Sequence, residues 1–268
     1  TTTCHLIYHI LRASGLRVGL ITTVNAITGD EETPTGLHVT TPPAPQVQAY
    51  LARMVRAGIT HCVLEATSHG LAQRRVDACD FDVAVMTNLT HEHLDFHGSW
   101  EAYRSTKARL FAMLGEGVRK PGVNKWAVVN RDDPSWKFFL EASGGQQVFT
   151  YSAAGQAEAD LWAADVRCEP GATRFTGLSA AGSVEFETSL VGLFNVANVL
   201  AASGAAGALG IWPEVIRRGV AATPPVPGRM ERIDAGQDFL AIVDFAHTPN
   251  ALRRALETAR LMVPGGGQ

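Results

Sequence analysis

The chain has 268 residues, of which 46% are hydrophobic, so it is long enough for one large or two medium globular domains and too apolar to be disordered. Its formal net charge is −3 with both signs interspersed, which argues against nucleic acid as a partner, because binding a phosphate backbone requires a concentrated basic patch. The four cysteines form no C-x-x-C pair, and no apolar run approaches the ~20 residues of a membrane span, so we expect a cytoplasmic protein without membrane insertion.

Helices and strands alternate in the first half of the chain. Gly15 and Gly58 follow the first two helical segments, at positions where glycine commonly ends a helix. The predicted helices cover residues 2–13 and 46–55 and begin again near residue 100, and the predicted strands cover residues 18–21, 61–65, 83–87 and 126–130. This alternation predicts an α/β fold with a mainly parallel central sheet and crossover helices.

The pattern changes between residues 160 and 190. Short segments there alternate apolar and polar side chains, as in residues 183–188, and predict antiparallel strands that flank the main sheet. Residues 195–209 and a segment that begins at Pro213 are helical again, since proline is favoured at the first position of a helix.

A turn-rich stretch follows. Three prolines and a glycine within residues 224–228 mark a hinge or linker, after which two strands and a helix from Pro249 are predicted. We therefore predict two domains, residues 1–228 and residues 229–268, the second too short to close a core by itself.

The densest group of reactive side chains follows the strand that begins at residue 83. The loop at residues 87–95 carries His93 among other imidazoles and carboxylates, and Lys107 falls about two turns into the next helix, for which Ser99 is the expected N-cap. A single loop histidine or mid-helix lysine is usually solvated. An open α/β sheet binds ligands beyond the carboxyl ends of its strands, however, so the combination predicts a site.

Glu65 ends the apolar strand at residues 61–65 and faces the same sheet edge as His93. Magnesium prefers oxygen ligands and completes its shell with waters and substrate phosphates, which makes Glu65 a candidate magnesium ligand. The alternative interpretation is a carboxylate capped by neighbouring hydroxyl groups.

Three threonines open the chain and precede a helix. In a phosphate loop, Gly-x-x-x-x-Gly-Lys-Ser/Thr, a hydroxyl that holds magnesium follows the lysine, and the N–H groups of the helix start hold phosphate. We expect the chain to be cut just after that lysine, and therefore this fragment alone to bind ATP weakly and to be inactive. A frayed helix cap is the alternative interpretation of Thr1.

Ordered motifs along nearly the whole chain resemble the Mur ligases, and most closely the members that add the third residue of the stem peptide. The matching segments are residues 40–42, 65–71, 75–76, 87–89, 93–98, Tyr103 with 107–111, 130–134, 192–198, 227–229 and 244–249. The number of matches in the same order makes the resemblance specific for the family.

The resemblance implies a central domain of the P-loop NTPase type, joined to the start of a Rossmann-like C-terminal domain that binds an amino acid. It implies a ligase of peptidoglycan synthesis that adds the third amino acid to UDP-N-acetylmuramoyl-L-Ala-D-Glu, with ATP and Mg²⁺ as cofactors. ATP would phosphorylate a carboxylate of this nucleotide-linked dipeptide, and the amine of a free amino acid would attack the acyl phosphate. Positively charged groups would offset the negative charge on the phosphoryl group as it is transferred. We expect a monomer.

The resemblance also assigns roles to individual residues. The implied magnesium ligands are Thr1, Glu65, His93 and Lys107, with Lys107 carbamylated and thereby converted into an anionic oxygen ligand. The implied ATP contacts are Thr1, Thr2, Asn195, Asn198, Arg229, Asp244 and His247. The implied substrate contacts are Thr40, Thr41, Ser68 and Arg75, and the implied catalytic residues are Glu65, His93, Lys107 and Arg229. Arg229 would reach the nucleotide when the hinge closes.

Two other hypotheses stay open at this point. One is another ligase of the superfamily, such as folylpolyglutamate synthase, against which residues 40–42 and 65–71 count. The other is a non-catalytic nucleotide-binding module. The amino acid added stays open among diaminopimelate, lysine and ornithine.

Two residues depart from the pattern of the family. Phe245 stands where the family commonly has tyrosine, which indicates apolar packing. Asn250 stands where aspartate is usual, so a negative charge is missing at this position.

Overall fold

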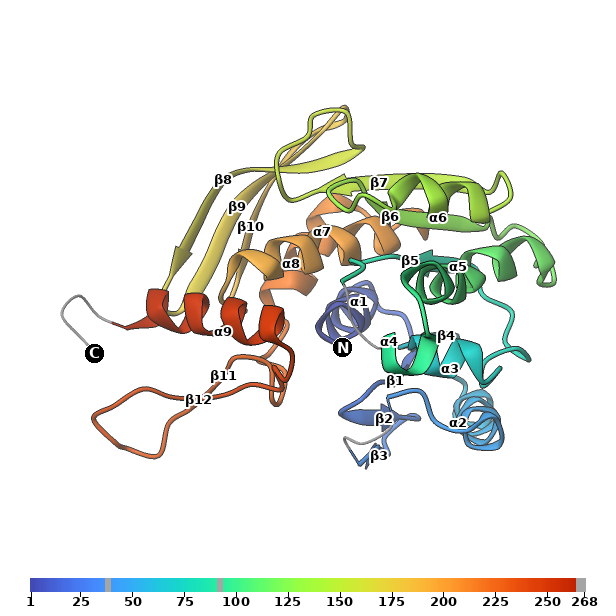
Figure 1. The fold of residues 1–268 in the computed structure, drawn as a ribbon, viewed down its shortest axis with the longest axis horizontal. Helices are drawn as coiled ribbons and strands as arrows, with labels where there is room; N and C mark the ends of the chain where they lie inside the picture. The colour runs from blue at the N-terminus through green and yellow to red at the C-terminus, as the bar shows by residue number, and fades with distance from the viewer. Residues whose placement is uncertain (37–39, 91–93, 264–268) are drawn as a thin grey trace.

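The computed structural model describes residues 1–36, 40–90 and 94–263 (Figure 1). Its helices are α1 (Thr2–Ala13), α2 (Ala44–Arg56), α3 (Ser68–Ala72), α4 (Leu94–His97), α5 (Trp100–Glu116), α6 (Trp136–Ala142), α7 (Leu193–Ala208), α8 (Pro213–Ala221) and α9 (Pro249–Met262). Its strands are β1 (Val18–Ile21), β2 (Asn25–Ile27), β3 (Glu32–Pro34), β4 (His61–Leu64), β5 (Val83–Val85), β6 (Trp126–Asn130), β7 (Gln147–Ser152), β8 (Leu161–Glu169), β9 (Ala172–Ser179), β10 (Gly182–Thr188), β11 (Glu231–Ile233) and β12 (Ala241–Val243).

Two sheets carry the fold. One has the order β3-β2-β1-β4 and the other the order β10-β9-β8-β7-β6-β5. The pairs β1–β4, β5–β6, β6–β7 and β7–β8 are parallel, whereas the pairs that involve β2, β3, β9 and β10 at the outer ends are antiparallel. The predicted α/β class with a mainly parallel centre and flanking antiparallel strands is confirmed.

Strand β1 is buried on both faces because a helix covers each of them. Its residues Val18 and Leu20 pack in the cluster that contains the apolar side of α1, and Ile21 packs with Tyr50 and Met54 of α2. At Gly19 an added Cβ would lie 2.5 Å from Met54 Sδ, so any other residue there would force the Met54 side chain to move. A continuous apolar run is thus the expected sequence for this strand.

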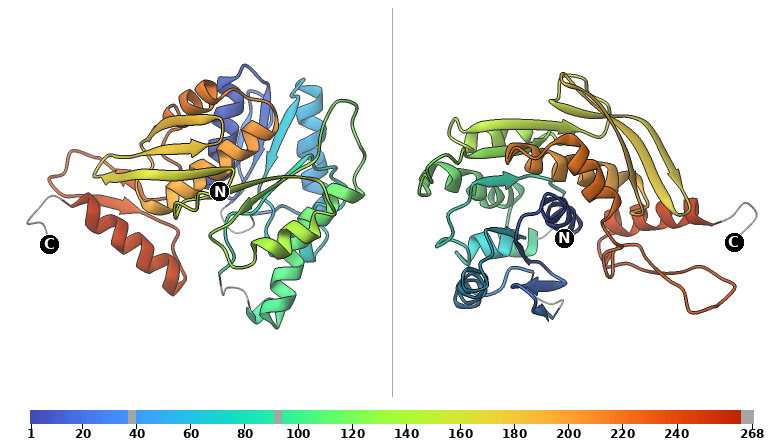
Figure 2. Two further views of the ribbon diagram at one scale, coloured as in Figure 1. Left: turned by 90° about the horizontal axis from the view of Figure 1, so that it is seen from above. Right: turned by 180° about the vertical axis from the view of Figure 1, so that it is seen from behind.

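The second sheet is covered in the same way. On one face α1 and α7 lie side by side (Figures 1 and 2) and share a core with Val128 of β6 and Tyr151 of β7. On the other face Phe111 of α5 and Phe139 of α6 pack against alternate residues of β5 and β6, with their ring centroids 5.2 Å apart. The carboxyl ends of the parallel strands stay uncovered by these helices.

The chain after residue 228 forms the β11–β12 hairpin and α9, drawn in orange and red (Figure 1). It joins the rest of the molecule through a small cluster in which Met230 and Met262 pack with Val191. The predicted domain boundary at residue 228 stays a prediction.

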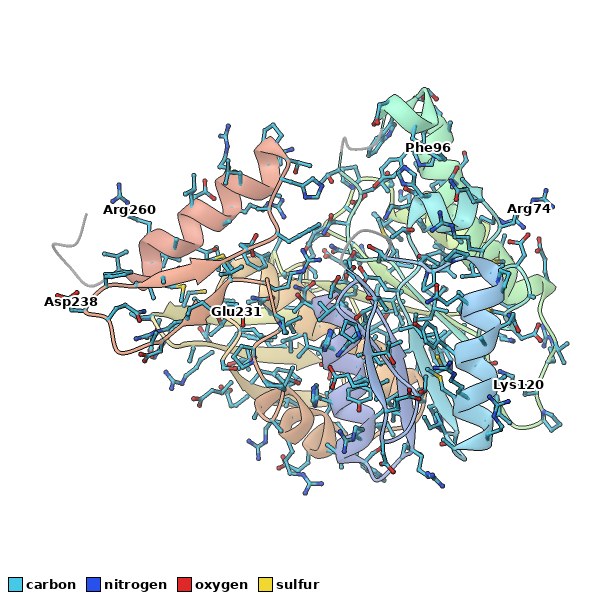
Figure 3. All side chains as sticks on the ribbon, turned by 90° about the horizontal axis from the view of Figure 1, so that it is seen from below. Arg74, Phe96, Lys120, Glu231, Asp238 and Arg260 are labelled. Atoms are coloured by element: carbon cyan, nitrogen blue, oxygen red, sulfur yellow. The ribbon has the colours of Figure 1, made fainter. Side chains whose placement is uncertain are left out.

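Within the described ranges, no helix is both long and apolar enough to cross a bilayer. Charged side chains of both signs, such as Arg74, Lys120 and Asp238, lie around the outside of the molecule (Figure 3).

His5 is a buried titratable group in the first helix. The pKa of His5 is lowered from 6.5 to about 4, mainly by burial and further by His9 and Arg229, while Glu65 opposes the shift. The unfolded chain therefore takes up a proton at pH values where the folded chain does not. Stability should fall as the pH drops from about 6.5 to about 4, by at most about 3 kcal/mol from this group.

Urea denaturation between pH 7.5 and 4.5 measures this effect, with His5→Gln as the matched variant. The variant should lose part of the pH dependence because it cannot take up the proton. Identical slopes of unfolding free energy against pH in the two proteins would contradict the assignment.

Candidate active site

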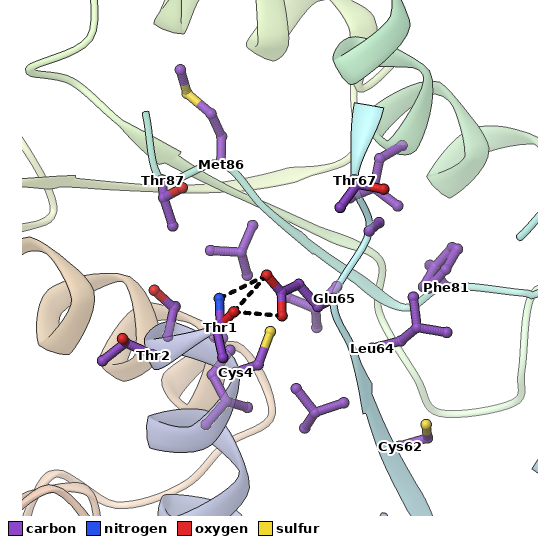
Figure 4. A pocket seen from close by; sticks show the side chains of 18 of the residues that line it. Thr1, Thr2, Cys4, Cys62, Leu64, Glu65, Thr67, Phe81, Met86 and Thr87 are labelled. Atoms are coloured by element: carbon purple, nitrogen blue, oxygen red, sulfur yellow. Dashed lines mark hydrogen bonds and ion pairs between the residues drawn. The ribbon is translucent and has the colours of Figure 1, made fainter. Parts of the chain in front are cut away.

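Glu65 follows β4 directly and lies among hydroxyl groups from two other elements. Thr1 Oγ1 lies 2.9 Å from both Oε1 and Oε2 and shares its one proton between them (Figure 4). From the turn after β1, the backbone N–H and the hydroxyl of Thr23 donate to Oε2, each at 3.2 Å. The start of α1 and the end of β1 thus meet at this carboxylate.

The environment keeps Glu65 ionised. Burial would raise the pKa of this carboxyl, but the hydrogen bonds from the Thr1 hydroxyl and from Thr23 lower it. A carboxylate surrounded by hydroxyl oxygens is a set of hard donors, which fits magnesium. Within the part of the chain that the structure describes, no three His, Cys, Asp or Glu side chains gather as a metal site, so the hydroxyls are the nearby companions of Glu65.

Arg229 also contacts Thr1, from the far end of the chain. One guanidinium nitrogen donates to Thr1 Oγ1 at 3.0 Å, and the guanidinium carbon lies 5.1 Å from the centroid of the Phe245 ring. Asp244 fixes this corner, because its carboxylate accepts the backbone N–H groups of Met230 and Ala246, both at 2.8 Å. Arg229 therefore reaches the start of α1.

The two asparagines of α7 face the same region. Asn198 donates from Nδ2 to Asn195 Oδ1 at 2.9 Å and accepts from Thr3 Oγ1, also at 2.9 Å. Asn195 is buried and donates to the carbonyl of Val191 at 2.9 Å. These bonds link the start of α7 to the start of α1.

The loop after β5 is held by three side chains of the neighbouring strands and loop. Asn130 Nδ2 donates to the carbonyl of Thr87 at 2.6 Å, and the hydroxyl of Tyr151 donates to the carbonyl of Met86 at 2.9 Å. Asp133 accepts the backbone N–H of Leu89 at 2.5 Å. This fixes the loop up to residue 90, while His93 lies outside the described residues.

Lys107 projects from α5, whose first turn is capped by Ser99 as predicted. Its Nζ lies 5.5 Å from the centroid of the buried Tyr103 ring. Lys107 lines the same cavity as Glu65 and Arg229.

The predicted substrate contacts surround the strand end beside Glu65. Thr23 Oγ1 lies 2.9 Å from Thr40 Oγ1, and Thr41 Oγ1 donates to the carbonyl of Glu65 at 2.9 Å. Arg75 donates to the carbonyl of Thr41 at 2.5 Å, and Ser68 is buried in the first turn of α3. Thr41 and Arg75 thus brace the backbone of this edge.

One cavity of about 1510 Å³ collects most of the predicted residues. The predicted residues that line it are Thr1, Thr2, Glu65, Ser68, Lys107, Asn195, Asn198, Arg229 and Asp244. Thr40, Thr41, Arg75 and His247 are not among the lining residues, and His247 is exposed, with Nδ1 2.9 Å from the carbonyl of Phe245.

Sequence reasoning missed Thr23 and the contact between Phe245 and Arg229. Thr23 follows the predicted strand at residues 18–21, so its place at a carboxyl strand end was a usable signal. Arg229 and Phe245 lie on opposite sides of the β11–β12 hairpin, so no local sequence pattern predicts their contact.

The fold agrees with the comparisons with known proteins. A model of the Mur ligase middle domain matches residues 1–206, and the chain belongs to this family. It is 42% identical to the UDP-N-acetylmuramoyl-L-alanyl-D-glutamate–2,6-diaminopimelate ligase of Geobacillus thermodenitrificans over 262 residues, which cover 97% of this chain and 52% of that protein. The chain thus spans about half the length of the curated relatives it matches.

Solved structures give the same result. A UDP-N-acetylmuramoyl-L-alanyl-D-glutamate–2,6-diaminopimelate ligase superposes with a TM-score of 0.80 at 34% identity, covering 99% of this chain and 52% of that one. A UDP-N-acetylmuramoylalanyl-D-glutamyl-2,6-diaminopimelate–D-alanyl-D-alanyl ligase from Acinetobacter baumannii shares the fold, with a TM-score of 0.76 at 20% identity over 97% of this chain and 52% of that one.

Neutralising Glu65 tests the centre of this site. In the complete protein, Glu65→Gln should reduce turnover by about 100-fold or more, because the amide keeps the shape but removes the charge that a cation requires. The measurement is ADP formation at saturating substrates. The exposed Glu116→Gln serves as the control, and an unchanged rate in Glu65→Gln would contradict the role.

Proposed function

We propose that the complete protein is an ATP-dependent ligase that adds the third amino acid to UDP-N-acetylmuramoyl-L-Ala-D-Glu. The observation that carries the proposal is the meeting of Glu65, Lys107 and Arg229 in one cavity, in a chain 42% identical to a ligase of that name. The same identity disfavours a folylpolyglutamate synthase, and the charged cavity disfavours a non-catalytic module.

The chemistry needs two steps. A carboxylate of the dipeptide attacks the γ-phosphorus of ATP, which forms an acyl phosphate and releases ADP. The amine of the amino acid then attacks the acyl carbon, which forms the amide and releases inorganic phosphate. A carboxylate and an ammonium do not condense in water, so activation by phosphate makes the ligation possible.

The residues of this chain supply binding and charge. Thr1, Glu65, His93 and Lys107 would hold Mg²⁺, which when bound neutralises charge on the transferring phosphoryl group. Arg229, 3.0 Å from Thr1, would approach the phosphates with a planar set of donors. Asn195 and Asn198 would contact the adenine, with Thr2, Asp244 and His247 completing the nucleotide site.

The dipeptide would bind at the opposite wall. Thr40, Thr41, Ser68 and Arg75 lie at the strand end next to Glu65, which supports a dipeptide site beside the phosphates. The names of the relatives favour 2,6-diaminopimelate as the incoming amino acid. Because the reaction would use ATP and a nucleotide-linked substrate, we favour the cytoplasm as its location.

A coupled assay tests the function. The complete protein with Mg-ATP and UDP-N-acetylmuramoyl-L-Ala-D-Glu should form ADP only when an amino acid is added, and mass spectrometry should show the tripeptide product. Diaminopimelate should exceed lysine and ornithine as substrate. Formation of ADP without an amide product, or none at all, would overturn the proposal, and a preference for lysine or ornithine would overturn only the choice of amino acid.

A further inference from the structure

Helix α9 packs one side against the rest of the molecule. Thr258 and Met262 are buried, and Ala255 and Ala259 pack in the small cluster that contains Val191. These positions recur every three or four residues, which is the spacing of a single face of a helix. The inner side of α9 therefore lies against the segment that leads into α7.

The contact with this segment is close. At Gly192, an added Cβ would lie 3.0 Å from the side chain of Thr258. The carbonyl of Val191 accepts a hydrogen bond of 2.9 Å from Asn195, so the segment is tied to the first turn of α7. In Figure 1 the first turn of α9 lies on the side of α1, and its last turn lies at the outside of the molecule. The first two turns of α9 therefore run beside the start of α7.

Arg254 gives this region a positive charge. Among the described residues of α9, it is the charged one that lines the cavity, together with Ala251 and Ala255. From α7, Asn195 and Asn198 line the same cavity. We call the part of the cavity between these five residues the α7–α9 compartment. Arg254 is exposed, so its guanidinium is accessible to a ligand there.

The α7–α9 compartment lies beyond the charged centre of the site. In the proposed function, magnesium and the phosphates lie at Glu65, 2.9 Å from the Thr1 hydroxyl. From the start of α1, Thr3 donates to Asn198, and Asn198 donates to Asn195, each at 2.9 Å. A chain of hydrogen bonds thus leads from the charged centre to the α7 wall of the α7–α9 compartment. A nucleotide with its phosphates at Glu65 would extend its base into this compartment.

We propose that Arg254 binds the base of the nucleotide, with the plane of its guanidinium against the face of the purine. The inference rests on the proposed function, which supplies the nucleotide. A guanidinium is planar and weakly hydrated, and it stacks on aromatic rings. Arg254 closes the base site from α9, opposite the amides of α7. It contributes to affinity rather than to rate, because the base does not change during phosphoryl transfer.

Two adjacent arginines of α9 provide matched variants. Arg253 and Arg254 are both exposed, but Arg253 is turned by about 100° around the helix and is not among the lining residues. Arg253→Ala and Arg254→Ala remove the same charge, and alanine favours the helix at both positions. A difference between the two variants therefore reports on the α7–α9 compartment rather than on net charge or helix stability.

Calorimetry with Mg-ATP and competition by magnesium tripolyphosphate test the contact in the complete protein. Arg254→Ala should weaken Mg-ATP binding by about tenfold and leave the inhibition constant of tripolyphosphate unchanged, because tripolyphosphate has no base. Steady-state kinetics should show a rise of about tenfold in KM for ATP, with kcat lowered less than about twofold. Arg253→Ala should behave as wild type in all three measurements.

Three results would overturn the proposal. Equal Mg-ATP affinities in the two variants would show that Arg254 does not contact the nucleotide. An equal loss for Mg-ATP and tripolyphosphate, or a loss in kcat in place of KM, would assign Arg254 to the phosphates instead of the base. A wild type that binds Mg-ATP with the expected difference between the variants but forms no tripeptide would overturn the proposed reaction and support the contact of Arg254.

Discussion

Replacing Lys107 with alanine in the complete enzyme should reduce acyl-phosphate formation by about 100-fold to 1000-fold while the fold survives. Lys107 lines the cavity that contains Glu65, and its ammonium would repel a cation unless it is converted to a carbamate, which is an anionic oxygen ligand. Positional isotope exchange in ATP, measured without amino acid, isolates the first step from the second.

A carbamate also has its own readout. With ¹³C-labelled bicarbonate, the wild type should show a carbamate carbon signal that Lys107→Ala lacks. The exposed Lys137→Ala should keep both the signal and the activity. Full isotope exchange in Lys107→Ala would exclude an essential role for this residue.

Arg229→Ala should lower the maximal rate by about 100-fold and weaken ATP binding much less. The guanidinium donates to Thr1 at 3.0 Å, where the phosphates would lie, so its charge would matter most as phosphoryl transfer proceeds. Steady-state kinetics and calorimetry with Mg-ATP separate rate from affinity. Equal losses in both would argue against a role in the transition state.

Two variants sharpen this experiment. The exposed Arg232→Ala controls for net charge and should behave as wild type. Phe245→Ala removes the ring that lies 5.1 Å from the Arg229 guanidinium and should lower the rate by less than Arg229→Ala. Full activity in Phe245→Ala would show that the ring does not position Arg229.

The fold was predictable where the sequence is locally periodic. The strands at residues 18–21 and 126–130 are continuous apolar runs because helices bury both faces, and the structure contains them with the predicted bounds. Strands β2 and β3 were missed, since they are three residues long and their pattern gives no signal. Strand β7 was missed as well, although it is six residues long.

The site was predictable only at strand ends. Glu65 and Lys107 could be placed at one edge because parallel strands share their carboxyl ends, and the structure brings both to one cavity. The orientation of Arg229 toward Thr1 depends on a Gly228 with φ +66° and on the turn that Asp244 caps, which no local pattern specifies. The functional roles of these residues stay predictions.

The contacts of α1 have a consequence for biosynthesis. Thr3 bonds to a residue 195 positions further along the chain, and Thr1 to one 228 positions further. A ribosome makes the chain from the amino end, so α1 emerges long before the partners that complete its surroundings exist. The cavity around Thr1 should therefore assemble as one of the last events of folding, and nascent chains that stall before Arg229 should be substrates for chaperones.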